Sequence, residues 1–183
     1  MADGKNVLAI VLMGVSGSGK TTIGKVLAKR LGATFADADD YHSAANKAKM
    51  AAGHALTDED RAPWLQTLND LLKSWIAQGK AGVLACSALK ASYRTTLGAG
   101  MSPEAVAFVW LDGSKEMIAA RLAARHHEYM NASLLDSQLA TLEPPAGALR
   151  VVNDRTPDQV TDEVMQKLGL TAGPGSPQTA AAN

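Results

Sequence analysis

The sequence lacks the cysteines that a disulfide-stabilised protein needs. It contains a single cysteine in 183 residues, Cys86, so no disulfide can form within the chain. Cys86 ends the apolar run Val83-Leu84-Ala85-Cys86, and a buried thiol without a basic neighbour stays protonated. We therefore interpret Cys86 as a core residue rather than a nucleophile, in a protein from a reducing compartment.

Net charge and long apolar runs are absent as well. Lys plus Arg and Asp plus Glu number 18 each, so no overall field recruits nucleic acid or an anionic membrane. No apolar run approaches the roughly 20 residues that cross a bilayer, and residues 1–5 lack the apolar segment of a signal peptide. We expect a cytoplasmic protein, without nucleic-acid or membrane partners, that binds its ligand at a local site.

Apolar runs of strand length alternate along the chain with stretches of helical periodicity. This alternation is typical of an α/β fold, in which helices cover both faces of a parallel sheet. The expected strands are residues 7–13, 34–38, 82–86, 105–111 and 149–152. The expected helices are residues 20–31, 44–52, 60–78, 88–97, 115–125, 133–142 and 157–168. Residues 1–169 suffice for one domain, whereas the composition of residues 170–183 predicts a disordered tail.

The stretch GVSGSGKTT follows the first expected strand and leads into the first expected helix. It matches G-x-x-x-x-G-K-[ST] in full and in the strand-to-helix context that this motif requires. Glycines let successive backbone N–H groups converge on one anion, and the helix adds the positive end of its dipole. We therefore predict a nucleotide phosphate site rather than a glycine-rich turn with an incidental lysine. Its residues are Gly14, Val15, Ser16, Gly17, Ser18, Gly19, Lys20, Thr21 and Thr22.

Two residues of this stretch have specific expected roles. Lys20 is predicted to reach the β- and γ-phosphates, and the Thr21 hydroxyl is predicted to ligate Mg²⁺. The sequence lacks the motifs of two other nucleotide-binding classes. It has no Asn-Lys-x-Asp motif for guanine, as a GTPase would have, and no Asp-Glu pair after the third strand, as a motor or helicase ATPase would have. Asp112 resembles a magnesium-directed acid, but Asp112-Gly113-Ser114 is also typical of a turn that caps the next helix, and we favour the turn.

Two carboxylates end the second expected strand. Asp37 and Asp39 point to the same face of an extended chain, at the sheet edge where α/β proteins hold their ligands. One of the two can accept a proton from an attacking hydroxyl while the other helps to hold the metal through water. The alternative is a solvated acidic turn.

Further motifs follow in order: D-x-D-x-x-H-x-x-x-N-x-x-K-M from Asp37, D-x-D-R-x-P-W-L from Asp58, and C-S-A-L-K-x-x-Y-R from Cys86. Polar residues this dense beside a phosphate site suit a polyhydroxylated substrate. Together with the phosphate motif, they make the chain resemble the gluconokinases of the short P-loop type, relatives of shikimate kinase. The resemblance covers about residues 7–144 and departs at Ser43, where the family commonly has proline.

The resemblance implies a three-layer α/β/α P-loop kinase fold. Its parallel sheet would have five strands in the order 2-3-1-4-5, with substrate-binding helices at about residues 41–78 and a small helical lid at about residues 125–135. The implied reaction is phosphorylation of D-gluconate by ATP at the 6-hydroxyl, with Mg²⁺ as cofactor. Because relatives are often dimers, a homodimer is expected.

The resemblance also implies roles for individual residues. Asp39 would orient or deprotonate the hydroxyl, which leaves Asp37 to help hold the metal. The other substrate-binding residues would be His42, Asn46, Arg61, Lys90 and Arg94, the first two on hydroxyls and the basic three on the carboxylate. Two alternatives remain open: an ion pair of Arg61 with Asp58 or Asp60, and an ordinary basic helix face for Lys90 and Arg94.

The resemblance to the wider group of related kinases implies that three more arginines contact the nucleotide. Arg121 and Arg125 share a helix face before the polar lid segment, and Arg125 is the better candidate to stabilise the transferring phosphoryl group. Arg155 would stack on adenine. His126 and His127 diverge on an extended chain and lack a third ligand, so we interpret them as exposed lid residues rather than a metal site.

Two other functions fit these residues less well than that of a gluconokinase. Shikimate kinase would place Gly-Gly-Gly after the third strand, where this chain has Ser87-Ala88-Leu89. A regulatory module would bind nucleotide without transferring a phosphoryl group, and the intact Lys20, Asp39 and Arg125 argue against that function.

Overall fold

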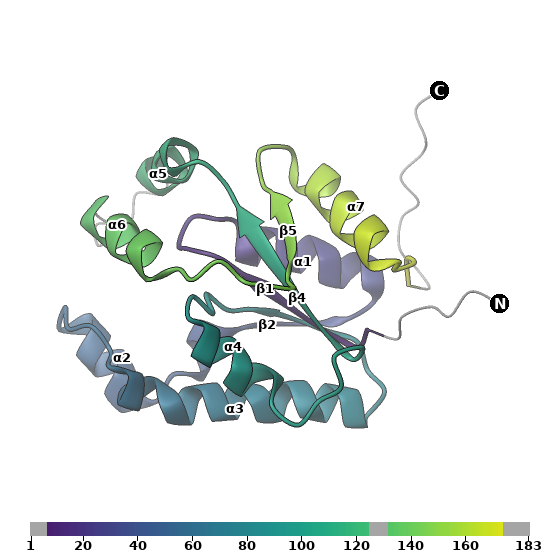
Figure 1. Cartoon of the computed structure of the whole chain (residues 1–183), viewed down its shortest axis with the longest axis horizontal. Helices are drawn as coiled ribbons and strands as arrows, with labels where there is room; N and C mark the ends of the chain where they lie inside the picture. The colour runs from purple at the N-terminus through teal and green to yellow at the C-terminus, as the bar shows by residue number, and fades with distance from the viewer. Residues whose placement is uncertain (1–6, 125–131, 174–183) are drawn as a thin grey trace.

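The computed structural model describes residues 7–124 and 132–173 (Figure 1). Five parallel strands form one sheet in the order β2-β3-β1-β4-β5, which confirms the predicted fold class and strand order. The strands are β1 (Ala9–Met13), β2 (Thr34–Asp37), β3 (Gly82–Ala85), β4 (Val106–Asp112) and β5 (Leu149–Val152).

Each predicted helix is present among the described residues. The helices are α1 (Lys20–Leu31), α2 (Ala44–Ala51), α3 (Asp58–Ala77), α4 (Ala91–Gly98), α5 (Lys115–Ala124), α6 (Ala132–Thr141) and α7 (Pro157–Leu168). Figure 1 shows α1 and α7 together on one side of the sheet and α3 and α4 together on the other. Helices α2, α5 and α6 lie beyond the carboxyl ends of the strands. No helix in the described ranges is both long and apolar enough to span a bilayer.

The two faces of the sheet carry separate hydrophobic cores. Successive residues of β1 point to opposite faces, so Ile10 and Leu12 pack with α1 and α7 whereas Val11 packs with α3. Leu68 and Leu72 of α3 are completely buried in the second core. Burial of one such side chain contributes about 2 kcal/mol, so these cores hold the helices firmly on the sheet.

The packing of α3 on the sheet requires a glycine at the start of β3. A Cβ atom at Gly82 would lie 2.0 Å from Cε3 of Trp75, which is far inside van der Waals contact. Cys86, just beyond β3, is 1% exposed, and its burial raises the pKa of the thiol to about 12. The interpretation of Cys86 as an unreactive core residue is confirmed.

Two local features near the site differ from the sequence prediction. Residues Ala38–Tyr41 form a 3-10 helix after β2, because the Asp37 side chain accepts a hydrogen bond from the Asp39 backbone N–H (3.2 Å) and turns the chain. Helix α3 begins at Asp58 rather than at residue 60. Thr57 and Asp60 form a reciprocal capping box, which extends the helix backward.

The beginning of the predicted disordered tail packs on the fold. Leu170 joins the core between α1 and α7, and its N–H donates to the Met165 carbonyl (2.9 Å). The Gly173 N–H donates to the Arg30 carbonyl at the end of α1 (2.9 Å). The tail boundary at residue 170 therefore needs correction, because Leu170 still has apolar surface to bury. Residues 174–183 lie outside the described residues.

Candidate active site

The residues between β1 and α1, 14–22, form the phosphate loop. Gly14, Gly17 and Gly19 have φ angles of 141°, 80° and 96°, in the left-handed region that favours glycine. A Cβ atom at Gly14 would lie 2.7 Å from the Leu111 carbonyl oxygen, and one at Gly19 would lie 2.3 Å from Nδ2 of Asn153. The loop thus depends on its glycines for both backbone conformation and close packing.

Lys20 begins α1 and folds back over the loop. Its Nζ donates hydrogen bonds to the carbonyl oxygens of Gly14 and Val15, each at 3.0 Å. The ammonium group therefore lies beside the first residues of the phosphate loop. A cation there is placed to compensate the charge of an anion that the loop amides bind.

Thr21, Asp37 and Asp39 meet at the carboxyl ends of β1 and β2. The Thr21 hydroxyl donates to Oδ2 of Asp37 (2.8 Å), while Oδ1 of Asp37 holds the Asp39 N–H. All three line an open polar cavity of about 560 Å³. The structure brings together the hydroxyl and the two carboxylates that the sequence singled out.

These oxygens fit a magnesium ion better than a softer metal. Mg²⁺ prefers carboxylate and hydroxyl oxygens and keeps several waters, so one protein carboxylate beside Thr21 is a suitable donor set. Within residues 7–124 and 132–173, no three His, Cys, Asp or Glu side chains gather into a ready-made metal site.

The protein environment tunes Asp39 toward a higher proton affinity. Burial and the neighbouring charge of Asp37 raise the pKa of the Asp39 carboxyl, while Lys20 and His42 act in the opposite direction. The cavity is open, so the side chain is still exposed to solvent although protein atoms surround much of it. Such a carboxylate is a better proton acceptor than an ordinary surface aspartate.

His42 is held on an aromatic surface. Its ring stacks on Trp64 with 4.3 Å between the ring centroids, and the Trp64 indole N–H donates to the Ala38 carbonyl (2.8 Å). Burial lowers the pKa of His42, against the attraction of Asp39. Nδ1 of His42 is buried and makes no hydrogen bond within the described part of the chain. Trp64 is thus a core residue that also positions His42.

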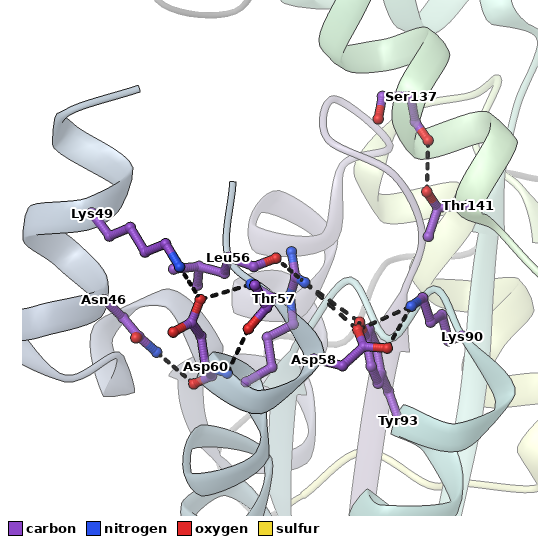
Figure 2. A network of polar contacts seen from close by, with 11 residues as sticks. Asn46, Lys49, Leu56, Thr57, Asp58, Asp60, Lys90, Tyr93, Ser137 and Thr141 are labelled. Atoms are coloured by element: carbon purple, nitrogen blue, oxygen red, sulfur yellow. Dashed lines mark hydrogen bonds and ion pairs between the residues drawn. The ribbon is translucent and has the colours of Figure 1, made fainter. Parts of the chain in front are cut away.

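Asn46 connects two helices. It is 7% exposed, and its Nδ2 donates to the Asp60 carbonyl (2.8 Å), which ties α2 to the start of α3. Lys49 reaches the Asp60 carboxylate from the same side, with 2.5 Å between Nζ and Oδ2 (Figure 2). The Asn46 amide nitrogen thus has a structural partner, which leaves Oδ1 for the predicted substrate contact.

Asp58 lies at the centre of a charged group that we call the Asp58 cluster: Asp58, Arg61, Lys90 and Tyr93. Lys90 Nζ lies 2.8 Å and 2.9 Å from the two Asp58 carboxylate oxygens, and the Tyr93 hydroxyl also donates to this carboxylate (Figure 2). Two hydrogen bonds lower the pKa of Asp58, the larger effect coming from Lys90 and the smaller from Tyr93. Arg61 lies 3.9 Å from Asp58, so the predicted alternative of an Arg61–Asp58 ion pair is present.

Arg94 is bonded to backbone carbonyls. Its Nη1 donates to Ala88 (2.9 Å) and Leu89 (3.0 Å), and its Nη2 donates to Glu143 (3.1 Å). Ala88 has a positive φ of 44°, which interrupts helical geometry and explains why α4 begins at Ala91 rather than at residue 88. Arg94 therefore braces the loop between β3 and α4, and burial lowers the pKa of its guanidinium.

The arginines expected at the nucleotide have different surroundings. Arg121 Nη2 donates to the Asn153 carbonyl (2.6 Å), and its Nη1 is buried without a hydrogen-bond partner in the described ranges. Arg155 turns toward α7, where it pairs with Glu163, and also contacts Asp154. Arg125, like His126 and His127, lies outside the described residues.

Asp112 and Gln138 complete the surroundings of the phosphate loop. Asp112 ends β4 and accepts hydrogen bonds from the Gly113 N–H (2.8 Å) and Arg150 (2.8 Å), and the Ser114 hydroxyl that follows accepts from the Met117 N–H (3.2 Å) at the start of α5. Gln138 of α6 contacts Ser16: Oε1 accepts from the Ser16 N–H (2.6 Å) and Nε2 donates to the Ser16 hydroxyl (3.1 Å). No sequence pattern could reveal this pair, because 122 residues separate its members.

A parallel sheet in this order, with a glycine loop before α1 and a lysine as the first residue of that helix, defines a P-loop kinase. The chain is accordingly a phosphotransferase that binds ATP. A family model described as an AAA domain matches residues 10–145. The chain belongs to the gluconokinase family. It is 47% identical to a probable gluconokinase of Xenopus tropicalis over 158 residues, 79% of this chain and 83% of the relative.

A bacterial relative and a solved structure agree with this assignment. The gluconokinase of Gluconobacter oxydans (strain 621H) is 46% identical over 160 residues, 86% of this chain and 89% of the relative. The crystal structure of a gluconokinase from Sinorhizobium meliloti 1021 superposes with a TM-score of 0.78 at 38% identity, covering 88% of this chain and 91% of that one. The predicted resemblance is confirmed, and the shikimate kinase and regulatory-module alternatives are disfavoured.

Proposed function

We propose that this chain transfers the terminal phosphoryl group of ATP to the 6-hydroxyl of D-gluconate, giving ADP and 6-phospho-D-gluconate. The observation that carries the proposal is the meeting of Lys20, Thr21, Asp37 and Asp39 at one sheet edge in a member of the gluconokinase family. These residue types serve the two needs of phosphoryl transfer, which are charge compensation and a proton acceptor.

The nucleotide side of the site would be formed by the phosphate loop. Backbone N–H groups of residues 14–22 would bind the phosphates, and Lys20 would exchange its carbonyl partners for phosphate oxygens. Thr21 and Asp37 would hold Mg²⁺, which when bound neutralises phosphate charge. Among the described residues, Nη1 of Arg121 is buried and makes no hydrogen bond. It would donate to a phosphate or to the base of the nucleotide. Arg125 and Arg155 remain predicted nucleotide contacts.

Asp39 would act on the sugar hydroxyl. As the bond from the substrate oxygen to phosphorus forms and the bond from phosphorus to the ADP oxygen breaks, the carboxylate accepts the hydroxyl proton. Its raised pKa, caused mainly by burial, makes it a stronger acceptor. His42, fixed on Trp64, would contact a neighbouring hydroxyl through Nδ1.

The carboxylate of gluconate would bind at the Asp58 cluster. Lys90 and Arg61 supply the positive charges, and Tyr93 supplies a hydroxyl donor. A substrate carboxylate would compete there with Asp58, which already accepts from Lys90 and Tyr93. Asn46 would contribute Oδ1, whereas Arg94 would support the site through its three carbonyl bonds.

A coupled ADP-release assay tests this function. Gluconate, other aldonates, shikimate and nucleoside monophosphates would each be offered with ATP and Mg²⁺, and Lys20→Ala would serve as the inactive control. We expect turnover with gluconate. Turnover with another acceptor, and none with gluconate, would refute the assignment. The homodimer and cytoplasmic location stay predictions, to be tested by light scattering of the purified chain and by cell fractionation.

A further inference from the structure

One contact of the phosphate loop is unexpected for a site that binds an anion. Oε1 of Gln138 accepts the hydrogen bond of the Ser16 N–H at 2.6 Å, and the Gln138 Nε2 donates to the Ser16 hydroxyl at 3.1 Å. A backbone N–H of this loop is a donor that a phosphate oxygen would use. The side-chain oxygen of Gln138 thus occupies the position at the Ser16 N–H that a phosphate oxygen would take.

The position of Lys20 indicates which phosphate this would be. Its Nζ lies at 3.0 Å from the carbonyls of both Gly14 and Val15, directly before Ser16. Since the lysine of this motif reaches the β- and γ-phosphates, the start of the loop lies on the side of these two phosphates rather than of the α-phosphate. Ser16 therefore lies on the side of the loop where a triphosphate carries a phosphate that a diphosphate lacks.

Helix α6 is fixed in the position that makes this contact. Leu135, one turn before Gln138, is 1% exposed and packs with Val15 and Leu89. Lys115 of α5 forms an ion pair with Asp136 (2.6 Å). The carboxamide of Gln138 is therefore presented to Ser16 by a packed element and not by a freely moving side chain on the surface.

We infer that Gln138 is a specificity-determining residue that competes with the terminal phosphate of ATP for the Ser16 amide. The inference rests on the proposed nucleotide binding. One N–H donates one good hydrogen bond, so a terminal phosphate can use the Ser16 amide only after Oε1 of Gln138 leaves it. On this inference the terminal phosphate, and not the β-phosphate, is the group that reaches the Ser16 amide, so a diphosphate would leave Gln138 in place. The side chain thus weakens triphosphate binding relative to diphosphate binding.

Calorimetric titration of the full chain with β,γ-imido-ATP and with ADP tests the competition. Gln138→Met keeps the length of the side chain but removes its acceptor, and we expect its Kd for the triphosphate to fall about fivefold with an unchanged Kd for ADP. Gln138→Glu keeps an acceptor and adds a negative charge, so its triphosphate Kd should rise about tenfold or more. Gln166→Met, on the exposed face of α7, is the matched control and should change neither value.

The remaining outcomes of these titrations are also decisive. An unchanged or higher triphosphate Kd in Gln138→Met would show that the side chain does not compete. Equal shifts for both nucleotides would show a structural effect on the loop. Loss of folding in Gln138→Met, seen by circular dichroism, leaves Gln138→Glu to decide, and an unchanged triphosphate Kd in that variant overturns the inference. If the unaltered chain binds neither nucleotide, the proposed function fails and the inference fails with it.

Discussion

Asp39 is the residue on which the proposed chemistry depends. In Asp39→Asn the side chain keeps its size but cannot accept a proton, so we expect kcat to fall by about 10²–10⁴-fold. The Kd for ATP should change little, since Asp39 is placed on the acceptor side of the site. Coupled ADP release gives kcat, and calorimetry gives the Kd. A kcat within a few-fold of the parent would remove Asp39 from the role of base.

The raised pKa of Asp39 also predicts a pH dependence. Only the ionised carboxylate accepts a proton, so the acidic limb of the kcat profile should lie above the pKa of an ordinary aspartate, about 3.9. The same environment disfavours the charge in the folded state, so ionisation of Asp39 lowers stability as the pH rises through its folded pKa. Asp39→Asn should therefore unfold at a higher temperature than the parent at pH 7, and this difference should vanish near pH 3. Thermal denaturation at both pH values checks the sign.

Substitution of Lys90, another single residue, tests the predicted binding site for the substrate carboxylate. In Lys90→Ala the Asp58 carboxylate loses its closest cation, and the substrate carboxylate loses its partner. We expect the KM for gluconate to rise about tenfold or more while the KM for ATP stays constant, because a charged hydrogen bond contributes about 1.5–3 kcal/mol. Lys80→Ala, an exposed lysine outside the Asp58 cluster, is the control. Steady-state kinetics with each substrate varied in turn would expose a structural effect as a rise in both KM values.

At the scale of elements, the distance between α3 and the sheet is set by one glycine. Gly82→Ala places a Cβ 2.0 Å from the Trp75 ring, so α3 must shift or β3 must distort. We expect a loss of about 1–3 kcal/mol in the free energy of unfolding, as overpacking typically costs.

Gly98→Ala is the matched control for this substitution. A Cβ at Gly98, the last residue of α4, meets only Phe108 at 3.8 Å, an ordinary contact. Its stability should be equal to or slightly above that of the parent, because alanine favours helices. Urea denaturation measures both variants, and equal midpoints for Gly82→Ala and Gly98→Ala would contradict the packing account.

At the scale of the whole molecule, the last described residues, 170–173, connect α7 to α1. Leu170 packs between α1 and α7, and Gly173 bonds to the end of α1. A chain truncated after Gly169 should be less stable than one truncated after Gly173 by about 1–2 kcal/mol, the contribution of a partly buried leucine. Equilibrium denaturation of the two truncated chains makes the comparison. Coincident curves would mean that Leu170 contributes nothing to the fold.

The parts of this molecule that the sequence predicted are those encoded within a few neighbouring residues. Helix α1 begins directly after Gly19 and ends at Leu31 as expected, because the glycine loop and the terminal Gly32 act locally. Asp37 and Asp39 line one cavity as predicted, but a 3-10 helix at Ala38–Tyr41, and not an extended strand, places Asp39 there. The start of α3 at Asp58 was not predicted, although the reciprocal capping bonds between Thr57 and Asp60 that set it are also local.

By itself, the sequence determined the alternation of strands and helices, the phosphate loop and the family, since each is written in short-range spacing and residue identity. Only the tertiary structure decided that Lys90 and Tyr93 converge on Asp58, that Trp64 carries His42, and that Gln138 contacts Ser16. These partners are far apart along the chain. Their meeting depends on strand order and helix packing, which sum many weak contacts that no local pattern contains.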